Sequence, residues 1–417
     1  MVKPAADDIP KSKQKITDSD KIGTGEVHPV SHDIRKRIVF QVFILLLGMT
    51  AALLVIEAGL RLFEKKSFTL DPCVSLDKDF HHVLIPESSC RFKTYEWDVE
   101  NKISSLGMRD GQFNLEKDDE TYRILALGDS FTFGHGVKAE NSYVNLLEKK
   151  LNEKRKVEII NSGVFGYSPI IYYLYLSKKG LSYNPNMVIL FFTLTDFWED
   201  RKRFSELRLS YPEITDDELS RKIEKTDIEF RFDLINSTPQ ITPGISHNLK
   251  IWLRGHVKTY GAIVDFIKKK GQPVQQDVLY QGDVDRDIMA LLRGDKISQE
   301  NWEELWKLPV RHLGMIADTL EKKDIKFMVV LIPEAIQVSD EEWPNRTALG
   351  LPKHFTDPRG PFQDELVKRL KRKNIEFVDL LSDFQKSDIG PLYFSDDGHF
   401  RESGHKLAAE VMFKFLK

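Results

Sequence analysis

The chain has 417 residues, of which 30% are charged and 41% hydrophobic, and its formal net charge is -3 at pH 7. This length is sufficient for one large domain with a full hydrophobic core, or for two ordinary domains. Because positive and negative charges nearly balance, the composition indicates neither a basic surface for nucleic acid nor an acidic tail, and we predict no nucleic-acid partner.

The amino-terminal segment differs in composition from the rest of the chain. Residues 1–37 have almost no periodic apolar pattern and predict a disordered tail. Residues 38–56 then form an apolar run that would span about 28 Å as a helix, close to the hydrocarbon thickness of a bilayer. The alternatives are a buried core helix and a cleaved signal peptide. The tail is too long for an ordinary signal peptide and no small-residue cleavage site follows, so we predict an uncleaved, single-pass membrane anchor over residues 38–62.

Basic residues flank both ends of this run, so the charge rule does not decide its orientation. The two cysteines of the chain, Cys73 and Cys90, lie in a lead-in segment, residues 63–120. Two cysteines so close together suit a disulfide in an oxidising compartment, and two unrelated thiols are the alternative. We therefore predict that the tail lies inside the cell and that the main domain lies on the extracytoplasmic side of the membrane.

From Tyr122 onward, short apolar segments alternate with amphipathic ones. The apolar segments are rich in β-branched and aromatic residues and predict strands at 122–127, 157–161, 187–194, 326–333 and 376–381. Helical patterns lie at 141–154, 169–180, 301–323, 361–373 and 402–417. The alternation predicts an α/β domain over residues 121–417, with a parallel sheet of about five strands and helices on both faces.

One stretch interrupts this alternation. Residues 198–300 contain far more chain than a single crossover helix needs. The segment is polar and charged, with prolines at 239, 243 and 273. We predict an insertion or lid on the carboxyl side of the sheet.

The sequence Gly128-Asp129-Ser130 directly follows the first predicted strand. A serine between a strand and a helix has its Oγ near the helix N-terminus, where free N–H groups and the helix dipole favour developing negative charge. A helix cap or a phosphate-binding turn would use the same residues. No Gly-Lys-Ser/Thr follows, which excludes a Walker loop, and the window is not G-x-S-x-G, which excludes an α/β-hydrolase elbow. Ser130 is therefore a candidate nucleophile.

Two further segments follow predicted strands, at the edge where functional groups of a parallel sheet collect. In 161-NSGVFGYSP-169, Gly163 or Gly166 would let a backbone N–H approach a ligand closely. In 193-TLTDFWED-200, Thr195 and Asp196 either face the crevice or cap a helix.

The last segment of interest, 395-SDDGHFRESGHKLAAE-410, precedes the final predicted helix. His399 lies three residues after Asp396 and two after Asp397. A carboxylate this close can hold one imidazole nitrogen and leave the other free to take a proton from a serine. His135 is near Ser130 in sequence and could line the site, and His405 suits the surface or the cap of a helix.

These blocks, taken in order, resemble those of the SGNH/GDSL hydrolases, in their single-pass, membrane-anchored and envelope-facing subgroup. Ser130 in GDSFTFG resembles the nucleophile block, Gly163 in NSGVFGYS the oxyanion glycine block, and His399 in DDGHF the block of the base. The third block ends in Thr195-Asp196, where the family has Asn-Asp. The segment 101-NKISSLGMRD-110 also looks like the lead-in of single-anchor members.

The resemblance implies a flavodoxin-like, three-layer α/β/α fold and a serine mechanism. Ser130 would be the nucleophile and His399 the base, and Asp396 has the family's spacing for the orienting carboxylate, with Asp397 as the alternative. The N–H groups of Ser130 and Gly163, together with Thr195, would bind the oxyanion. This chemistry needs no metal and no cofactor.

The function we predict is that of a membrane-anchored serine esterase that removes acyl groups, such as acetyl, from an envelope glycan or lipid. One alternative is an O-acyltransferase that acts on an exported polysaccharide, with polysaccharide-biosynthesis proteins of the envelope as partners. The other is a catalytically weak, glycan-binding envelope protein, which the threonine at position 195 keeps open.

Overall fold

The computed structural model describes residues 32–62, 69–70, 73–94, 96–109, 113–235, 299–342, 344, 360–395 and 397–417. The chain divides into two units, Met1–Leu62 and Phe63–Lys417, which are described separately below. Most of the predicted tail and residues 236–298 of the predicted insertion lie outside the described residues.

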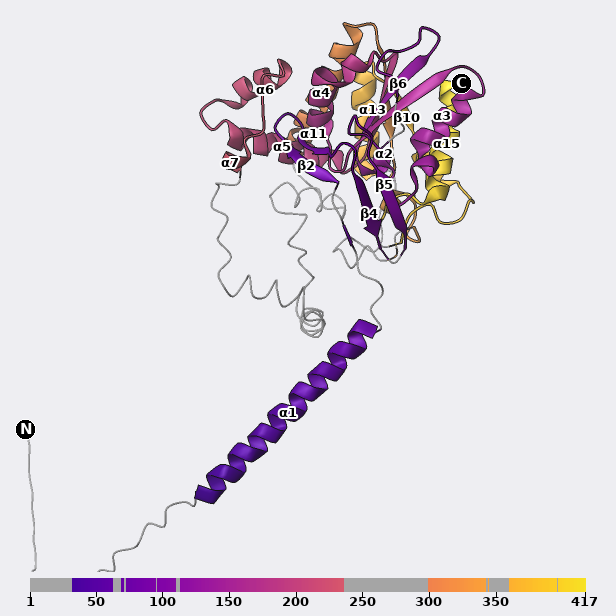
Figure 1. The fold of residues 1–417 in the computed structure, drawn as a ribbon. Helices are drawn as coiled ribbons and strands as arrows, with labels where there is room; N and C mark the ends of the chain where they lie inside the picture. Colours follow the sequence, from indigo (N-terminus) through magenta and orange to yellow (C-terminus); the bar gives the residue numbers. More distant parts are fainter. Residues whose placement is uncertain are drawn as a thin grey trace, which may run out of the picture. The chain divides into compact units, whose positions relative to one another are not determined.

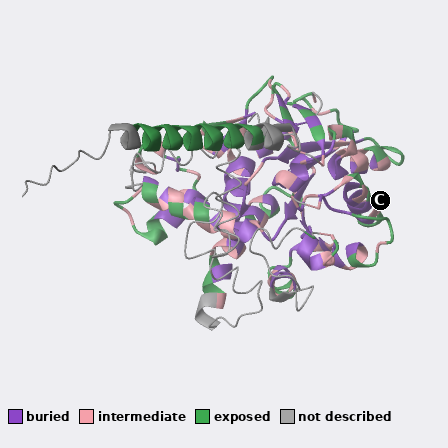
Figure 2. Cartoon of the chain, turned by 90° about the horizontal axis from the view of Figure 1, so that it is seen from below, coloured by how far each residue is buried: buried purple, intermediate pink, exposed green. Residues whose placement is uncertain are grey.

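The described part of the first unit is one helix, α1 (His32–Leu62). Its segment Lys36–Val55 contains 20 residues with a mean hydropathy of 2.6, and none of this segment is buried (Figure 2). The helix begins at His32, before the predicted apolar run. Its length and composition are those of a membrane span, and a signal sequence near an amino terminus has the same properties.

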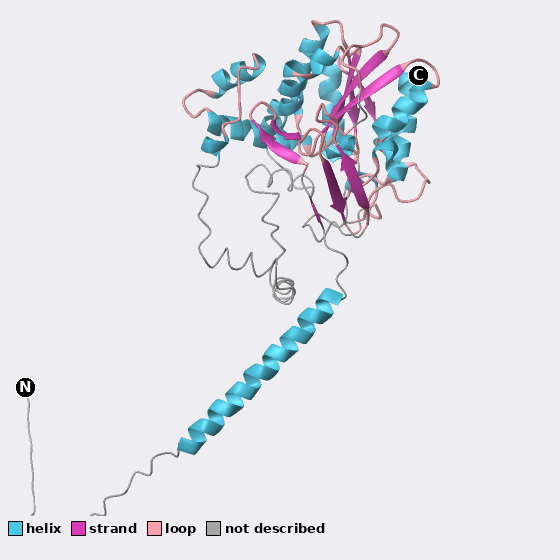
Figure 3. Cartoon of the chain, in the orientation of Figure 1, coloured by secondary structure: helices cyan, strands magenta, loops and turns pink. Residues whose placement is uncertain are grey.

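The second unit is built on a five-stranded, wholly parallel sheet (Figures 1 and 3). Its strands are β6 (Tyr122–Gly128), β7 (Val157–Gly163), β8 (Met187–Phe192), β9 (Lys326–Leu331) and β10 (Glu376–Asp379). They lie in the order β10-β9-β8-β6-β7. Numbered along the chain, this is the 2-1-3-4-5 order of flavodoxin-like folds, which places the topological switch point beside β6. The predicted fold class and all five predicted strands are confirmed.

Helices cover both faces of this sheet. Successive strand residues point to opposite faces, and both sets are apolar, so each face must be buried. Leu125 and Leu127 belong to one buried cluster, whereas Ile124 and Ala126 belong to the other. The first face carries α4 (Pro169–Lys178), α5 (Asp196–Ser210), α11 (Gln299–Glu321) and α13 (Gly360–Arg372). The second carries α3 (Tyr143–Asn152), α12 (Ala335–Val338), α14 (Leu381–Gln385) and α15 (Glu402–Leu416), with α3 and α15 side by side (Figure 1).

The remaining described helices are short. They are α2 (Ser130–Phe133), the 3-10 helices η1 (Ala139–Asn141) and η2 (Gly180–Tyr183), α6 (Asp216–Glu224) and α7 (Phe232–Ile235). In the predicted insertion, α5 and α6 pack on the first face through Leu207, Leu219 and Ile223, which are all buried. The predicted lid stays a prediction, because residues 236–298 lie outside the described residues.

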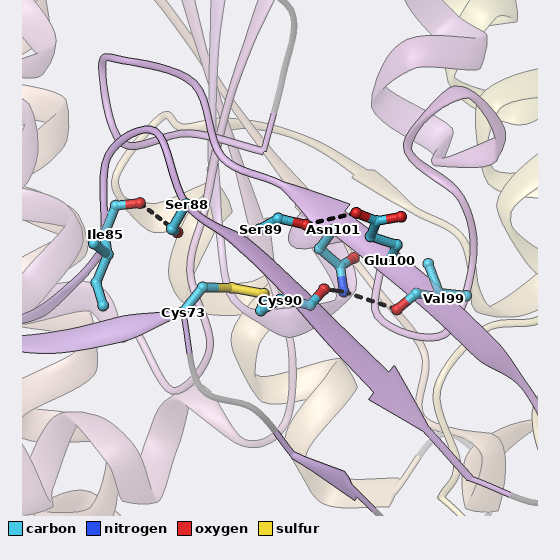
Figure 4. Close-up of a disulfide and its surroundings, with 8 residues drawn as sticks. All are labelled: Cys73, Ile85, Ser88, Ser89, Cys90, Val99, Glu100 and Asn101. Carbon is cyan, nitrogen blue, oxygen red and sulfur yellow. Dashed lines mark hydrogen bonds between the residues drawn. A yellow bond between two sulfur atoms is a disulfide. The ribbon is translucent and has the colours of Figure 1, made fainter.

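The lead-in segment forms two small antiparallel sheets. One contains β1 (Thr69–Leu70), β4 (Ser89–Lys93) and β5 (Asp98–Lys102), and the other contains β2 (Val74–Asp77) and β3 (His81–Leu84). A disulfide between Cys73 and Cys90 joins β4 to the residue before β2, as predicted (Figure 4). Phe92 and Trp97 belong to the same buried cluster as the first face of the main sheet. The lead-in is therefore part of the folded domain.

Removing the disulfide should destabilise the second unit. It closes a loop with a sequence separation of 17 residues, for which the expected loss of stability is about 3 kcal/mol. We expect the double variant Cys73→Ser/Cys90→Ser to unfold at a lower temperature than the oxidised wild type, when full-length protein in detergent is followed by tryptophan fluorescence. Reductant should lower the Tm of the wild type and leave that of the double variant unchanged. Two freely labelled thiols in the unreduced wild type would contradict the prediction.

Candidate active site

Ser130 lies immediately beyond the carboxyl end of β6, the strand at the switch point. It is the first residue of α2, and the preceding Asp129 caps this helix by accepting a hydrogen bond from the Phe131 N–H at 2.9 Å. The strand ends in Gly128, where a Cβ would lie 1.9 Å from Thr132 Oγ1, so glycine is required for the close turn. The turn places the Ser130 hydroxyl at the amino end of α2.

His399 lies in a hairpin just before α15 and contacts Ser130. Ser130 Oγ lies 2.8 Å from His399 Nε2. The hairpin is held by a bridge between Tyr393 and Phe400 and by the Phe394 N–H, which donates to His399 O at 2.8 Å. The His399 side chain is 23% exposed, so its ring is accessible to a substrate while in contact with the serine.

Asp397 is the described carboxylate that orients His399. Its Oδ1 lies 2.8 Å from the His399 backbone N and 3.2 Å from the ring Nδ1. Asp396, the other candidate, lies outside the described residues. Burial alone would lower the pKa of His399, but the charge of Asp397 and its hydrogen bond outweigh burial and raise this pKa above its ordinary value. Burial of Asp397 is in turn outweighed by the charge of His399, so the pKa of Asp397 lies well below its usual range.

Two of the predicted oxyanion donors have other partners in the structure. The Gly163 N–H donates to Asn161 Oδ1 at 3.0 Å, and a Cβ at Gly163 would lie 2.3 Å from Phe133 N. Gly163 therefore allows close packing of two backbone segments. The Thr195 hydroxyl lies 2.7 Å from Thr193 Oγ1 and 3.3 Å from the carboxylate of Asp129.

The backbone N–H groups of Ser130 and Gly166 are among those that donate no hydrogen bond to another backbone group of the described residues. Gly166 lies in the loop after β7, and the register of β6 and β7 pairs Gly128 with Gly163. Because the strands are parallel, the loops that carry Ser130 and Gly166 leave the sheet at the same edge.

A buried acidic cluster supports the ends of β6 and β8. Asp129 Oδ2 accepts a hydrogen bond from Thr193 Oγ1 at 2.9 Å, and burial raises the pKa of Asp129. Asp196 is fully buried, and its Oδ2 accepts from the Thr193 N–H at 2.8 Å, while its Oδ1 accepts from the Tyr172 hydroxyl at 3.0 Å. Asp196 thus fixes the end of β8 against α4, and Asp129 fixes the turn that carries Ser130 against the end of β8.

The lead-in contributes to the site as well. Glu96, in the turn between β4 and β5, accepts hydrogen bonds from the Ser395 N–H at 2.8 Å and from Arg401 Nη2 at 3.0 Å. The neighbouring Trp97 ring packs edge-on against His135, with the ring centroids 4.7 Å apart. The turn between the lead-in strands therefore clamps the hairpin that carries His399.

The carboxyl-terminal part of the chain, residues 293–417, matches the family model described as "SGNH hydrolase-like domain, acetyltransferase AlgX". This part of the chain is therefore similar to an SGNH hydrolase-like domain. The match confirms the predicted SGNH resemblance for this part of the chain, which contains the His399 block. The matched SGNH segment includes β9, β10, α15 and the His399 hairpin, whereas Ser130 lies before it. No curated protein is similar enough to the chain to count as a match.

Solved structures of SGNH-type and related esterases are similar to this chain at low sequence identity. The acetyl xylan esterase AlAXEase is 16% identical, with 71% of this chain and 100% of that chain covered and a TM-score of 0.36. A putative lipolytic protein of the G-D-S-L family from Desulfitobacterium hafniense DCB-2 is 14% identical, with 70% of this chain and 98% of that chain covered and a TM-score of 0.34. The lipase/acylhydrolase from Enterococcus faecalis is 12% identical, with 70% of this chain and 94% of that chain covered and a TM-score of 0.34. At these TM-scores the likeness carries no argument about activity.

The sequence indicated that His135 could line this site, but it did not identify the partner of this residue. His135 Nε2 lies 3.4 Å from Asp397 Oδ2, a carboxylate supplied from far along the chain. Together with His399, these side chains form one group, within the described residues, whose ligand atoms all lie within 4.8 Å of one another, close enough to share a metal ion. His405 is buried, not on the surface, and its Nδ1 accepts from the Tyr143 N–H at 3.2 Å, so it caps α3.

The sequence did not identify the role of Arg109, which holds the loop that follows Ser130. The side chain is buried, and its guanidinium donates to three backbone carbonyls, those of Phe133 (2.9 Å), Gly134 (2.5 Å) and Val137. Burial lowers the pKa of Arg109 to about 10, so the group is protonated at neutral pH. Its motif, SLGMRD, is visible in the sequence, but the partners are backbone atoms that no pattern identifies.

Replacing Arg109 should therefore destabilise the domain. Arg109→Met keeps much of the apolar stem but removes the donors from buried carbonyls, so we expect a loss of at least about 2 kcal/mol. The matched control is Arg91→Met, which breaks an ion pair with Asp98 in which the arginine side chain is 65% exposed. Because water screens such a pair, we expect a much smaller loss of stability than in Arg109→Met. Thermal unfolding of full-length protein measures both. Equal losses would show that the buried bonds contribute no more than a surface pair.

Proposed function

We propose that the protein is a membrane-anchored serine esterase of the SGNH type. The observation that carries the proposal is the 2.8 Å contact between Ser130 Oγ and His399 Nε2, with Asp397 on the other side of the imidazole. A hydroxyl, an imidazole and a carboxylate in this order are the groups that nucleophilic catalysis at an ester requires.

In the proposed mechanism, His399 removes the proton of Ser130 as Oγ attacks the ester carbonyl. Asp397 stabilises the imidazolium that forms, and His399 then returns the proton to the leaving alcohol. In the second half of the reaction, His399 removes a proton from water as the water oxygen attacks the acyl carbonyl. His399 then returns this proton to Ser130 Oγ as the acyl–Oγ bond breaks and the acid leaves. This chemistry requires no metal and no cofactor.

The oxyanion would be bound by the N–H groups of Ser130 and Gly166. Both belong to loops at the carboxyl edge of the sheet, and neither donates a hydrogen bond to another backbone group of the described residues. The N–H of Gly163 is a weaker candidate, because it is already bonded to Asn161. Thr195 would contribute through Asp129, whose position its hydroxyl helps to fix, and it would donate to the oxyanion directly if it left that carboxylate.

The proposed substrate is an acylated glycan or lipid of the cell envelope. The anchor α1 would hold the domain at a membrane, and the Cys73–Cys90 disulfide is consistent with an oxidising, extracytoplasmic compartment. The description of the matching family model names an acetyltransferase, which is consistent with acyl chemistry. The catalytically weak, glycan-binding alternative predicts no turnover despite this geometry.

The serine mechanism can be tested directly. Full-length protein in detergent should hydrolyse p-nitrophenyl acetate and react with a fluorophosphonate at Ser130. Ser130→Ala should lower hydrolysis by about a thousandfold or more and abolish labelling, because the nucleophile is lost. The matched control is Ser89→Ala, which removes a hydroxyl on β4 that donates to Glu100 on β5. This variant should behave as the wild type. A wild type that is neither labelled nor active would rule the proposal out.

A second candidate function is transfer of the acyl group to a sugar hydroxyl. The observation that favours it is the family model, whose description names the acetyltransferase AlgX. The same Ser130 acyl-enzyme would form, and the acceptor hydroxyl would replace water in the second step, with His399 as its base.

Adding an acceptor separates these two functions. With p-nitrophenyl acetate as donor and a panel of de-acetylated oligosaccharides as acceptors, a transferase should yield acetylated oligosaccharide, detected by mass spectrometry. An esterase should release acetate at the same rate with and without acceptor. Product formation must disappear in Ser130→Ala, because transfer that persists in this variant does not use the proposed acyl-enzyme.

A further inference from the structure

The two carboxylate oxygens of Asp397 have different surroundings. Oδ1 is bonded to the backbone and the ring of His399. Oδ2 is buried and has no well-aligned hydrogen bond among the described residues, and the side chain that faces it is His135, with Nε2 at 3.4 Å. A buried carboxylate oxygen without a donor is costly. A donor at this position would therefore fix the carboxylate and, through it, the ring of His399.

The surroundings of His135 favour one form of its ring. The ring packs against Trp97, Phe165 and Phe92, with centroid distances of 4.7, 5.3 and 5.8 Å. Its Nδ1 is buried and has no partner among the described residues. An imidazolium would bury a charged N–H at Nδ1 against aromatic rings. A neutral ring protonated at Nε2 leaves Nδ1 as an acceptor and directs its one N–H toward Asp397.

The charges around the His135 ring also favour its neutral form. Burial lowers the pKa of His135, and the nearby positive charges of His399 and Arg109 lower it further, against the effect of Asp397. The lead-in strand β4 and the loop after β7 present the uncharged rings of Phe92 and Phe165. His135 is therefore neutral at pH 7, whereas Asp397 raises the pKa of His399. The two histidines share one carboxylate in different protonation states.

We propose that His135 is a positioning residue that donates its Nε2–H to Asp397 Oδ2 and so holds Asp397 and His399 in line with Ser130. This inference rests on the proposed function. The 3.4 Å distance is longer than an optimal hydrogen bond, and bonds of this kind tighten when a substrate is bound. The four side chains then form one continuous series of polar contacts from the nucleophile to the aromatic face of the lead-in.

Two substitutions separate hydrogen bonding from packing. His135→Phe keeps an aromatic ring and removes the donor, whereas His135→Gln keeps an N–H that can reach Asp397. The measurement is the rate of fluorophosphonate labelling of Ser130 in the full-length protein, between about pH 5 and pH 9, which spans the histidine range. We expect His135→Phe to slow labelling about tenfold, the change expected for the loss of one hydrogen bond to a charged group.

The pH profile distinguishes positioning from a merely structural role. Without the His135 N–H, the charge of Asp397 raises the pKa of His399 further. The acid limb of the profile, which is the pH range where the labelling rate falls as His399 becomes protonated, should therefore move to higher pH. His135→Gln should restore most of the rate and the position of the limb. Phe92→Leu, which trims a ring that packs on His135 but removes no polar contact, is the control and should leave the limb in place.

Several outcomes would overturn the inference. One is a His135→Phe profile equal to that of the wild type, and another is an equal shift in Phe92→Leu. A third is loss of wild-type labelling on chelation with EDTA and its recovery with zinc, since His135 would then be a metal ligand. If the wild type is not labelled at Ser130, the proposed function itself fails. A labelled wild type with unaffected His135 variants removes the positioning role alone.

Discussion

The contact between Ser130 Oγ and His399 Nε2 joins residues 269 positions apart, and the rest of the site depends on it. Ser130 is fixed by β6, which is paired on both sides. The hairpin of His399 is not among the strands of the main sheet, and side chains hold it in place. The Tyr393 hydroxyl donates to Pro333 O at 2.7 Å, and Glu342 accepts from the Leu392 and Tyr393 N–H groups at 2.8 and 3.0 Å.

Buried carboxyl groups gather at the same edge of the sheet. Burial raises the pKa values of Asp129 and Asp196, and it raises the pKa of Glu334 to about 7, with a further contribution from the charge of Asp129. The charges of Asp129 and Glu334 also raise the pKa of His399, beyond the larger effect of Asp397. A surrounding of this kind stabilises the imidazolium that forms when a serine is deprotonated.

The main sheet was predictable because strands covered on both faces are continuous apolar runs, and all six residues of β8 are buried. The lead-in sheet could not be predicted in the same way. Its strand β5 is short and buries Asn101, whose side chain donates to Cys90 O, so β5 does not show a regular alternation of apolar and polar residues. Ser130 and His399 were found from motifs at the ends of elements. The partner of His135 could not be found in this way, because it is a carboxylate 262 positions away (397 minus 135). The neighbours of His135 in sequence give no indication of such a distant residue.

The clamp between Glu96 and Arg401 spans 305 positions and has a consequence for how the chain folds. Contacts of such high sequence separation form slowly, because a long loop must close before they contribute. During synthesis the lead-in sheet emerges early, while the hairpin that packs on Trp97 and bonds to Glu96 is made almost last. The nascent chain therefore exposes an aromatic surface for most of its translation, the kind of surface that chaperones bind and that aggregates form from.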